Sequence, residues 1–357
     1  MAYSDPSYMN DQGTPVGPDG LAITGANQIN TAYVQAYKAG FEQAFQQSES
    51  KLQPYFEAET QNEEFQYFDR IGTAEAMEED ATRYGDNPNS DISHDRRRIG
   101  LKDYELGKYV DEKDLKRVLT DPMNAYTQAL LASGKRKIDD IIIGKFFGEA
   151  YVGKSGETVR SFVTAANTEN SSKIVVGSES AGDIQTGGDY TKSGTANTEG
   201  FTIGGDYDAS NGGSGLTLAK LRAARRTMLK LHAIDQDTIV DCFVSAKQLD
   251  DLLGITEVVS SDFAVRKSLA EGSVTTFMGF RFIHTERLPI STGSDGDERR
   301  CIISTPKALK LSTSTALKGD VWRVPAKKNI PYVYFKLSAE ASRMWGEVSG
   351  EIRCNES

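Results

Sequence analysis

The sequence predicts an α+β fold that extends beyond a compact core. Three observations support this prediction. A long amphipathic helix is expected over residues 121–151, short strand and helix patterns alternate over residues 216–315, and two stretches, 1–50 and 58–100, lack the pattern of a compact core. With 357 residues the chain is long enough for two domains, or for one domain with extensions.

The charge balance limits the classes of ligand. The chain has 41 Lys and Arg residues against 51 Asp and Glu residues, a net charge of −10, and a pI near 5.0. Such a surface repels polyanions on average, so sequence-specific DNA binding is not expected. The mean hydropathy is −0.46, and no apolar run approaches the roughly 20 residues of a membrane span. We therefore expect a soluble protein without a membrane partner.

The beginning of the chain and its cysteines indicate a reducing compartment. Residues 1–20 are polar and lack the basic start and apolar stretch of a secretory signal. Cys242, Cys301 and Cys354 are scattered and form no CxxC pair. We predict three free thiols that act as small core residues.

Residues 1–50 are predicted to form an N-terminal arm. Tyr33, Tyr37 and Phe41 recur at about helical spacing between residues 27 and 47, and such an apolar stripe must pack on something. No hydrophobic partner adjoins it in sequence. It either reaches across the fold or onto a neighbouring subunit, or it is an ordinary helix on its own core.

Residues 58–100 are highly charged and follow no core pattern. A Gly/Asp/Asn/Pro turn at 85–90 separates an acidic part from a basic part, which predicts a long exposed hairpin or loop. The alternative is a solvated surface loop. Together with the arm, this loop supplies the residues that we expect between subunits: Glu63, Glu64, Glu78, Glu79, Arg96, Arg97, Arg98, Tyr33, Tyr37 and Phe41.

A long helix is predicted to begin at Asp121-Pro122, where the carboxylate caps free amides and proline takes the first helical position. An apolar face then turns at about 3.6 residues as far as Tyr151. Thirty residues would span roughly 45 Å. Gly134 and Gly144 lie inside this helix, and each costs up to about 1 kcal/mol.

Residues 153–215 are rich in Gly, Ser, Thr and Asn and predict a loop-rich β insertion, with short strands at 172–176 and 200–203. Regular patterns return at residue 216. Thr217 is expected to cap a helix, and the elements predicted after it are a strand over 238–244, a helix over 246–253, and strands over 276–284 and 300–304.

The C-terminal part, residues 316–357, contains a clear strand pattern. Val333, Phe335 and Leu337 alternate with polar or amphipathic residues between Pro331 and Leu337. Val348 and Ile352 indicate another strand. The first of these strands is expected to be half-buried.

One motif formally fits the phosphate loop GxxxxGK[ST], from Gly148 to Ser155. Such a loop follows a buried strand and opens a helix, whereas here a helix precedes it and a Gly/Ser/Thr-rich region follows. A nucleotide hydrolase that uses Lys154 and Ser155 is kept as the alternative. No metal or cofactor site is expected, because no histidine has a second ligand at metal-binding spacing. We predict no catalytic residue and no enzyme activity.

A basic cluster lies on the helix predicted after Thr217, with Arg222, Arg225, Arg226 and Lys230. Basic side chains can neutralise phosphates, but no aromatic platform accompanies this cluster in the sequence. A solvated or salt-bridged face is the favoured interpretation. In an oligomer, the expected partner is an acidic stretch of a neighbouring subunit.

The order of these elements resembles the major capsid (coat) protein of tailed bacteriophages, with the Hong Kong 97-type fold. The likeness covers most of residues 50–357. Two stretches carry it, residues 121–151 and residues 216–289. Their motifs are Gly134-Lys-Arg-Lys-Ile-Asp-Asp140, Gly148-Glu-Ala-Tyr151, Ser245-Ala-Lys-Gln-Leu-Asp-Asp-Leu-Leu253, Ser261-Asp-Phe263, Glu271-Gly272 and Phe277-Met-Gly-Phe-Arg-Phe-Ile283.

The resemblance implies a division of the chain. It gives an N-terminal arm (1–50), a peripheral domain (51–152) with an extended charged loop and a spine helix, the insertion (153–215), an axial domain (216–315), and C-terminal strands that return to the peripheral domain (316–357).

The resemblance also implies a function and partners. The chain would form pentamers and hexamers of itself in an icosahedral phage head that encloses DNA without reading its sequence. It would belong to the virion capsid and assemble in the host bacterial cytoplasm. The N-terminal segment is too short for a built-in scaffold, so a separate scaffolding protein is expected, with a portal and a decoration protein as further partners. A tail or appendage subunit is the other structural alternative.

Overall fold

The computed structural model describes residues 47–72, 77, 92, 94–110, 123–163, 172–180, 187, 189–207, 215–254, 276–293 and 296–356. The predictions for most of the N-terminal arm, for the turn at 85–90 and for the Asp121-Pro122 helix start lie outside these residues. Within them, no helix is long and apolar enough to cross a membrane.

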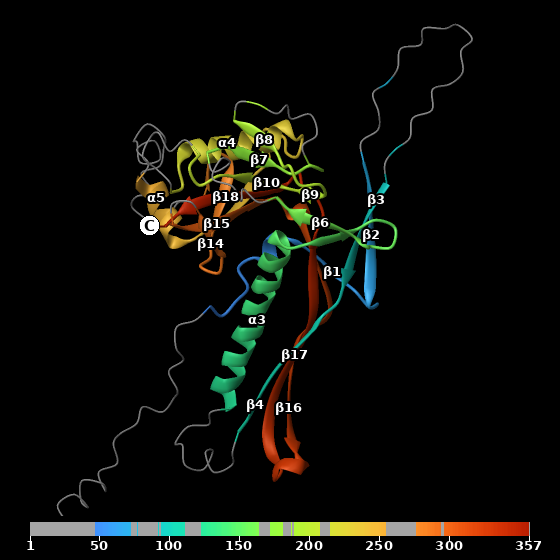
Figure 1. The fold of residues 1–357 in the computed structure, drawn as a ribbon. Helices are drawn as coiled ribbons and strands as arrows, with labels where there is room; N and C mark the ends of the chain where they lie inside the picture. Colours follow the sequence, from blue (N-terminus) through green and yellow to red (C-terminus); the bar gives the residue numbers. More distant parts are fainter. Residues whose placement is uncertain are drawn as a thin grey trace, which may run out of the picture. The chain divides into compact units, whose positions relative to one another are not determined.

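The described chain combines helices with three sheets, which confirms the α+β prediction (Figure 1). The helices are η2 (Gln53–Tyr55), α3 (Met123–Phe147), α4 (Leu218–Lys230), α5 (Ala246–Gly254), η5 (Pro306–Ala308) and η6 (Pro325–Lys327). The strands are β1 (Glu57–Thr60), β2 (Phe65–Ile71), β3 (His94–Gly100), β4 (Asp103–Tyr109), β5 (Ala150–Val152), β6 (Thr158–Phe162), β7 (Ile174–Val176), β8 (Tyr190–Lys192), β9 (Thr198–Glu199), β10 (Phe201–Ile203), β11 (Val240–Val244), β12 (Thr276–Phe277), β13 (Phe280–His284), β14 (Ile290–Gly293), β15 (Gly296–Ser304), β16 (Leu309–Val324), β17 (Ile330–Arg343) and β18 (Ser349–Asn355).

The largest sheet has nine strands in the order β12-β13-β11-β15-β18-β10-β7-β8, with β14 beside β15. The predicted elements of residues 216–315 are confirmed here. The hydroxyl of Thr217 accepts a hydrogen bond from the amide of Lys220 at 3.3 Å and begins α4. Cys242, Cys301 and Cys354 are free and fully buried on three neighbouring strands of this sheet, as predicted.

The short strands predicted within residues 153–215 are present as β7 and β10, and the sequence does not predict which sheet they join. Strands β7, β8 and β10 belong to the nine-stranded sheet, and β10 pairs in parallel with β18, Phe201 opposite Gly350. Strands β7 and β10 are three residues long and buried on both faces. Such strands show no polar alternation, so the Gly- and Ser-rich surroundings dominate the sequence pattern.

A four-stranded sheet, β1-β16-β17-β4, packs against α3 (Figure 1). The alternation predicted along β17 is confirmed, because Val333, Phe335 and Leu337 are buried while the residues between them are half-buried. Helix α3 continues through Gly134, where a Cβ atom would lie 2.5 Å from the side chain of Leu317 on β16. This glycine lets helix and strand approach closely.

The end of the long helix and the placement of the C-terminal strands differ from the prediction. Helix α3 ends at Phe147, four residues before Tyr151, because the chain turns at Gly148 and continues as β5. The C-terminal strands also separate. Strand β17 pairs with β4, whereas β18 lies between β15 and β10 in the nine-stranded sheet. Residues 316–357 therefore do not all return to one sheet.

Two adjacent carboxylates on α3 connect it to distant segments. Asp139 is buried and accepts hydrogen bonds from the backbone amides of Lys51 and Leu52 at 3.0 and 3.2 Å. Asp140 forms a bidentate ion pair with Arg287, at 2.6 to 2.9 Å, in the loop between β13 and β14. The Asp-Asp pair of the sequence motif thus connects α3 to the segment at residues 51–52 and to the loop between β13 and β14.

Candidate functional site

The strands β2 and β3 form an antiparallel hairpin within a sheet of order β2-β3-β5-β6-β9, which confirms the predicted hairpin. The register places Arg98 opposite Tyr67 and Arg97 opposite Phe68. Successive side chains of a strand point to opposite faces. The three consecutive arginines are therefore divided, with Arg96 and Arg98 on one face and Arg97 on the other.

One face of the hairpin is exposed and combines apolar with charged side chains, among them the ion pair of Asp69 and Arg96. Phe65, Tyr67 and Ile71 are 43%, 42% and 62% exposed. The guanidinium of Arg96 lies 5.5 Å from the ring centroid of Tyr67, and that of Arg98 lies 5.1 Å from that of Phe65. Aromatic rings beside cations on an exposed strand are typical of a binding surface.

The other face is anchored by a buried ion triad that joins β3, β9 and β17. Glu199 accepts from Nη2 of Arg97 at 2.6 Å and from Nε of Arg343 at 2.7 Å, and all three side chains are at most 2% exposed. Burial works to raise the pKa of Glu199, but the charges and hydrogen bonds of Arg343 and Arg97 outweigh it and hold the pKa below its ordinary value. The carboxylate is therefore charged at neutral pH.

A second anchor fixes the same face of β2. The guanidinium of Arg70 lies 4.2 Å from the ring centroid of Trp345 and donates to the backbone carbonyl of Met344. It also lies 3.6 Å from the carboxylate of Asp95, which pairs with Arg160 at 3.0 Å. The base of the hairpin is thus held by packing and charge on one side while its opposite side stays open.

A second exposed surface, rich in aromatic side chains, lies on β17 and on its two neighbouring strands, β16 and β4. Trp322 is 42% exposed, and its ring centroid lies 5.3 Å from the rings of both Tyr332 and Tyr334. Tyr109 extends this row at 4.4 Å from Tyr332. We call Trp322, Tyr332, Tyr334 and Tyr109 the aromatic row. Val321, next to Trp322, is half exposed, so both faces of β16 lack cover here.

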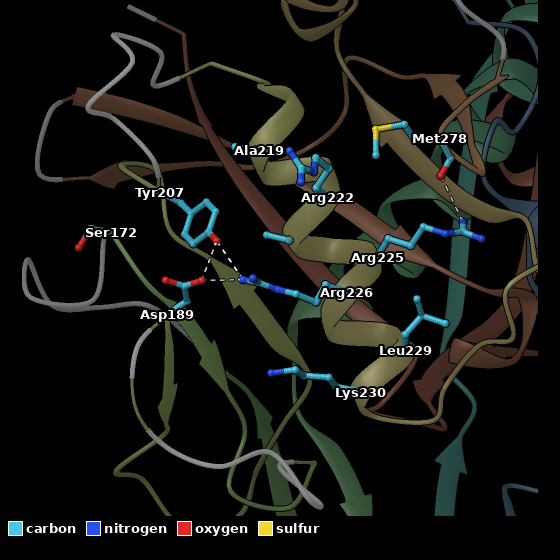
Figure 2. A pocket seen from close by; sticks show the side chains of 11 residues that line it. Ser172, Asp189, Tyr207, Ala219, Arg222, Arg225, Arg226, Leu229, Lys230 and Met278 are labelled. Atoms are coloured by element: carbon cyan, nitrogen blue, oxygen red, sulfur yellow. Dashed lines mark hydrogen bonds and ion pairs between the residues drawn. The ribbon is translucent and has the colours of Figure 1, made fainter.

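The exposed side of α4 carries a third surface, a depression of about 830 Å³. Figure 2 shows Arg226 and Lys230 extending toward Asp189 and Tyr207, whereas Arg225 extends to the other side, toward Met278. Arg226 pairs with Asp189 at 2.8 Å, as a salt-bridged face predicts. An aromatic residue does accompany the cluster, contrary to the sequence-based expectation. Lys230 lies 4.2 Å from the ring centroid of Tyr190, which comes from β8, distant in sequence.

The segment that fits the phosphate-loop pattern, Gly148 to Ser155, begins directly after α3, contains β5 and ends in the turn before β6. Residues 153–157 connect β5 to β6, and the amide of Gly153 donates to the carbonyl of Arg96 at 3.2 Å. A helix precedes the motif and a strand follows it, the reverse of the arrangement that phosphate binding requires.

Nucleotide is expected to leave the thermal stability unchanged. At 100 times its dissociation constant, a bound ligand would stabilise the chain by about 2.7 kcal/mol. A melting curve with and without Mg-ATP measures this directly. A rise in Tm that the Lys154→Ala variant abolishes would restore the hydrolase alternative.

The ion pair of Glu356 with Arg299 is expected to make the stability of the fold depend on pH. Hydrogen bonds from Arg299, at 2.8 and 2.9 Å, lower the pKa of Glu356 to about 2, together with bonds from Gln248 and Ser245. A lowered pKa stabilises the fold above the unfolded value, near 4.3, and this contribution is lost as pH falls through about 2. At pH 7, Glu356→Gln should cost about 1 to 2 kcal/mol. The Tm difference from wild type should shrink steadily from pH 5 to pH 2; a constant difference would contradict the assignment.

The residues predicted between subunits divide into three groups. Glu63 and Glu64 are exposed, and Arg96 and Arg98 lie on the open face of the hairpin. Glu78, Glu79, Tyr33, Tyr37 and Phe41 lie outside the described residues.

For Arg97, the prediction is wrong. Its side chain is fully buried and pairs with Glu199 of the same chain. The alternation of a strand would have separated it from Arg96 and Arg98, but nothing local in the sequence points to Glu199 or Arg343 as its partners.

Comparison with family models finds one matching family, and comparison with solved structures finds a shared fold. A family model described as phage capsid protein matches residues 29–356. No curated protein sequence matches the chain.

Three solved structures illustrate the fold. The capsid of cyanophage Pam1 is similar with a TM-score of 0.64 and 14% identity, over 92% of this chain and 98% of that chain. The capsid of cyanophage P-SCSP1u has a TM-score of 0.61 and 11% identity, over 92% and 95%. The mature capsid of bacteriophage PhiM1 has a TM-score of 0.60 and 10% identity, over 91% and 93%.

Proposed function

The chain belongs to the phage capsid protein family and has its Hong Kong 97-type fold, and on this premise we propose that it is the major capsid protein of a tailed phage, which forms pentamers and hexamers in an icosahedral head around the DNA. The match to the family model over residues 29–356 carries the proposal. The function is structural, and no step of it requires catalysis.

The uncovered surfaces of the single chain support self-assembly. The open face of the hairpin and the aromatic row each expose large apolar side chains, Phe65 and Trp322 among them, to solvent. Contiguous exposed apolar surface on a single subunit marks interaction sites. In a shell, many modest contacts of this kind hold each subunit more firmly than one contact alone.

The remaining partners follow from the same proposal. A separate scaffolding protein and a portal would direct assembly in the host bacterial cytoplasm, and a decoration protein could bind the finished shell. The net charge of −10 suits a lining that does not bind packed DNA tightly. The enclosed DNA is therefore held without sequence-specific contacts.

Sedimentation of the purified full-length chain tests the proposal. We expect fast-sedimenting particles above a threshold concentration. Trp322→Ser should raise that concentration roughly tenfold or more, because burial of a large aromatic side chain contributes about 1.5–3 kcal/mol. Its Tm should change little, since Trp322 is half exposed in the isolated chain. A chain that remains monomeric at every concentration, with or without scaffold, would contradict the proposal.

A further inference from the structure

Three basic side chains form a regular stripe along the exposed side of α4. Arg222, Arg226 and Lys230 are spaced by four residues, so they follow one another at about 6 Å along the helix. All three are exposed. They border the depression described above, which we call the α4 groove.

The positive charge of this stripe is only partly balanced within the chain. Arg226 pairs with Asp189 and also donates to the hydroxyl of Tyr207 at 3.1 Å. Among the described residues, neither Arg222 nor Lys230 forms an ion pair with a carboxylate. In a chain with a net charge of −10, two unbalanced cations on the same side of one helix indicate an anionic partner.

The lining of the α4 groove also includes apolar side chains, those of Ala219, Ala223, Leu229 and Met278. Figure 2 shows Leu229 and Met278 on the side of α4 away from Asp189. Such a surface fits an extended segment that combines acidic and apolar side chains better than it fits a small ion.

The chain itself contains a segment of this composition. Residues 74–80 read Ala-Glu-Ala-Met-Glu-Glu-Asp, with four carboxylates around Met77, and lie between β2 and β3. Met77 is fully exposed, with a relative exposure of 102%. A methionine is flexible enough to fill an irregular apolar surface.

We propose that the α4 groove binds residues 74–80 of a second copy of this chain, with Met77 against Leu229 and Met278 and the carboxylates at Arg222 and Lys230. The inference rests on the proposed function, because it places one contact of the shell. It also gives the acidic part of the hairpin loop a specific receptor on the neighbour.

A nucleic-acid backbone suits the α4 groove less well. The aromatic ring over which these cations lie, that of Tyr190, is only 6% exposed, so it is not available for base stacking.

Peptide binding tests the inference directly. A fluorescent peptide of residues 72–82 is titrated with the full-length chain below its assembly concentration, and anisotropy is measured. Arg222→Glu with Lys230→Glu should weaken binding at least about tenfold. Lys307→Glu with Lys318→Glu changes the net charge equally at exposed positions elsewhere and should leave binding unchanged. A peptide carrying Glu78→Lys and Glu79→Lys should bind the α4 variant better than it binds wild type.

Three outcomes would overturn the inference. In the first, the peptide does not bind, or it binds wild type and the α4 variant equally. In the second, a mixed-sequence oligodeoxynucleotide binds wild type and the control variant in place of the peptide, and only the α4 variant fails to bind it. Sedimentation of the same proteins separates this from the proposed function. If wild type and the α4 variant both form shells at the same concentration, the groove contact is wrong while the capsid function stands.

Discussion

Replacement of Glu199 by glutamine is expected to lower the free energy of unfolding by about 3–5 kcal/mol. The substitution leaves two fully buried guanidinium groups, Arg97 and Arg343, without their shared carboxylate. Breaking a buried ion network by removing one partner costs about this much, because the remaining charges stay desolvated. Chemical denaturation of wild type and Glu199→Gln measures the difference.

The matched control is Glu179→Gln. Glu179 is 37% exposed and lies 3.7 Å from Arg160, so this pair is screened by solvent. Its loss should cost less than about 1 kcal/mol. Equal effects of the two substitutions would show that the buried triad does not anchor the hairpin.

Shortening the hairpin at its tip is expected to abolish shell formation and leave the fold intact. Ile71 and His94 are the last paired residues of β2 and β3. Replacing residues 72–93 with Asn-Gly closes the two strands with a two-residue turn of the type that suits hairpins. The Tm should stay within a few degrees of wild type, whereas assembly should fail because the acidic loop no longer reaches a neighbour.

The position of this cut follows from the structure. Removal of residues 60–98 would also delete the buried Arg97 and the strand pairing of β3. A failure to assemble could then result from misfolding, and the experiment would not test the loop. In the control variant, a Gly/Ser linker of the original length replaces residues 72–93, which separates the effect of the lost charge from that of the shortened loop. Normal shells from the Asn-Gly variant would rule out the loop as an assembly element.

Local patterns in the sequence predict much of the fold. The long helix follows from its apolar period, and Val333, Phe335 and Leu337 on β17 follow from their alternation. Both signals arise within one element, because each element covers its core with one face. The helix cap at Thr217 is equally local.

The parts that sequence could not give depend on partners far apart in the chain. Strand β10 pairs with β18 about 150 residues later, and its three residues, buried on both faces, carry no alternation. Glu199 lies between Thr and Gly residues that indicate a loop, yet its carboxylate forms buried ion pairs with Arg97 and Arg343. Three consecutive arginines also read as one charged patch, although a strand divides them between two faces.

Electron microscopy of the purified full-length chain tests the central claim most directly. If the chain is a capsid subunit, negatively stained samples above the assembly threshold contain closed polyhedral shells, and image averages of their capsomers show five- and six-fold arrangements. Tubes or fibres would identify a tail or appendage subunit instead, and a field of separate monomers under all assembly conditions would contradict the account.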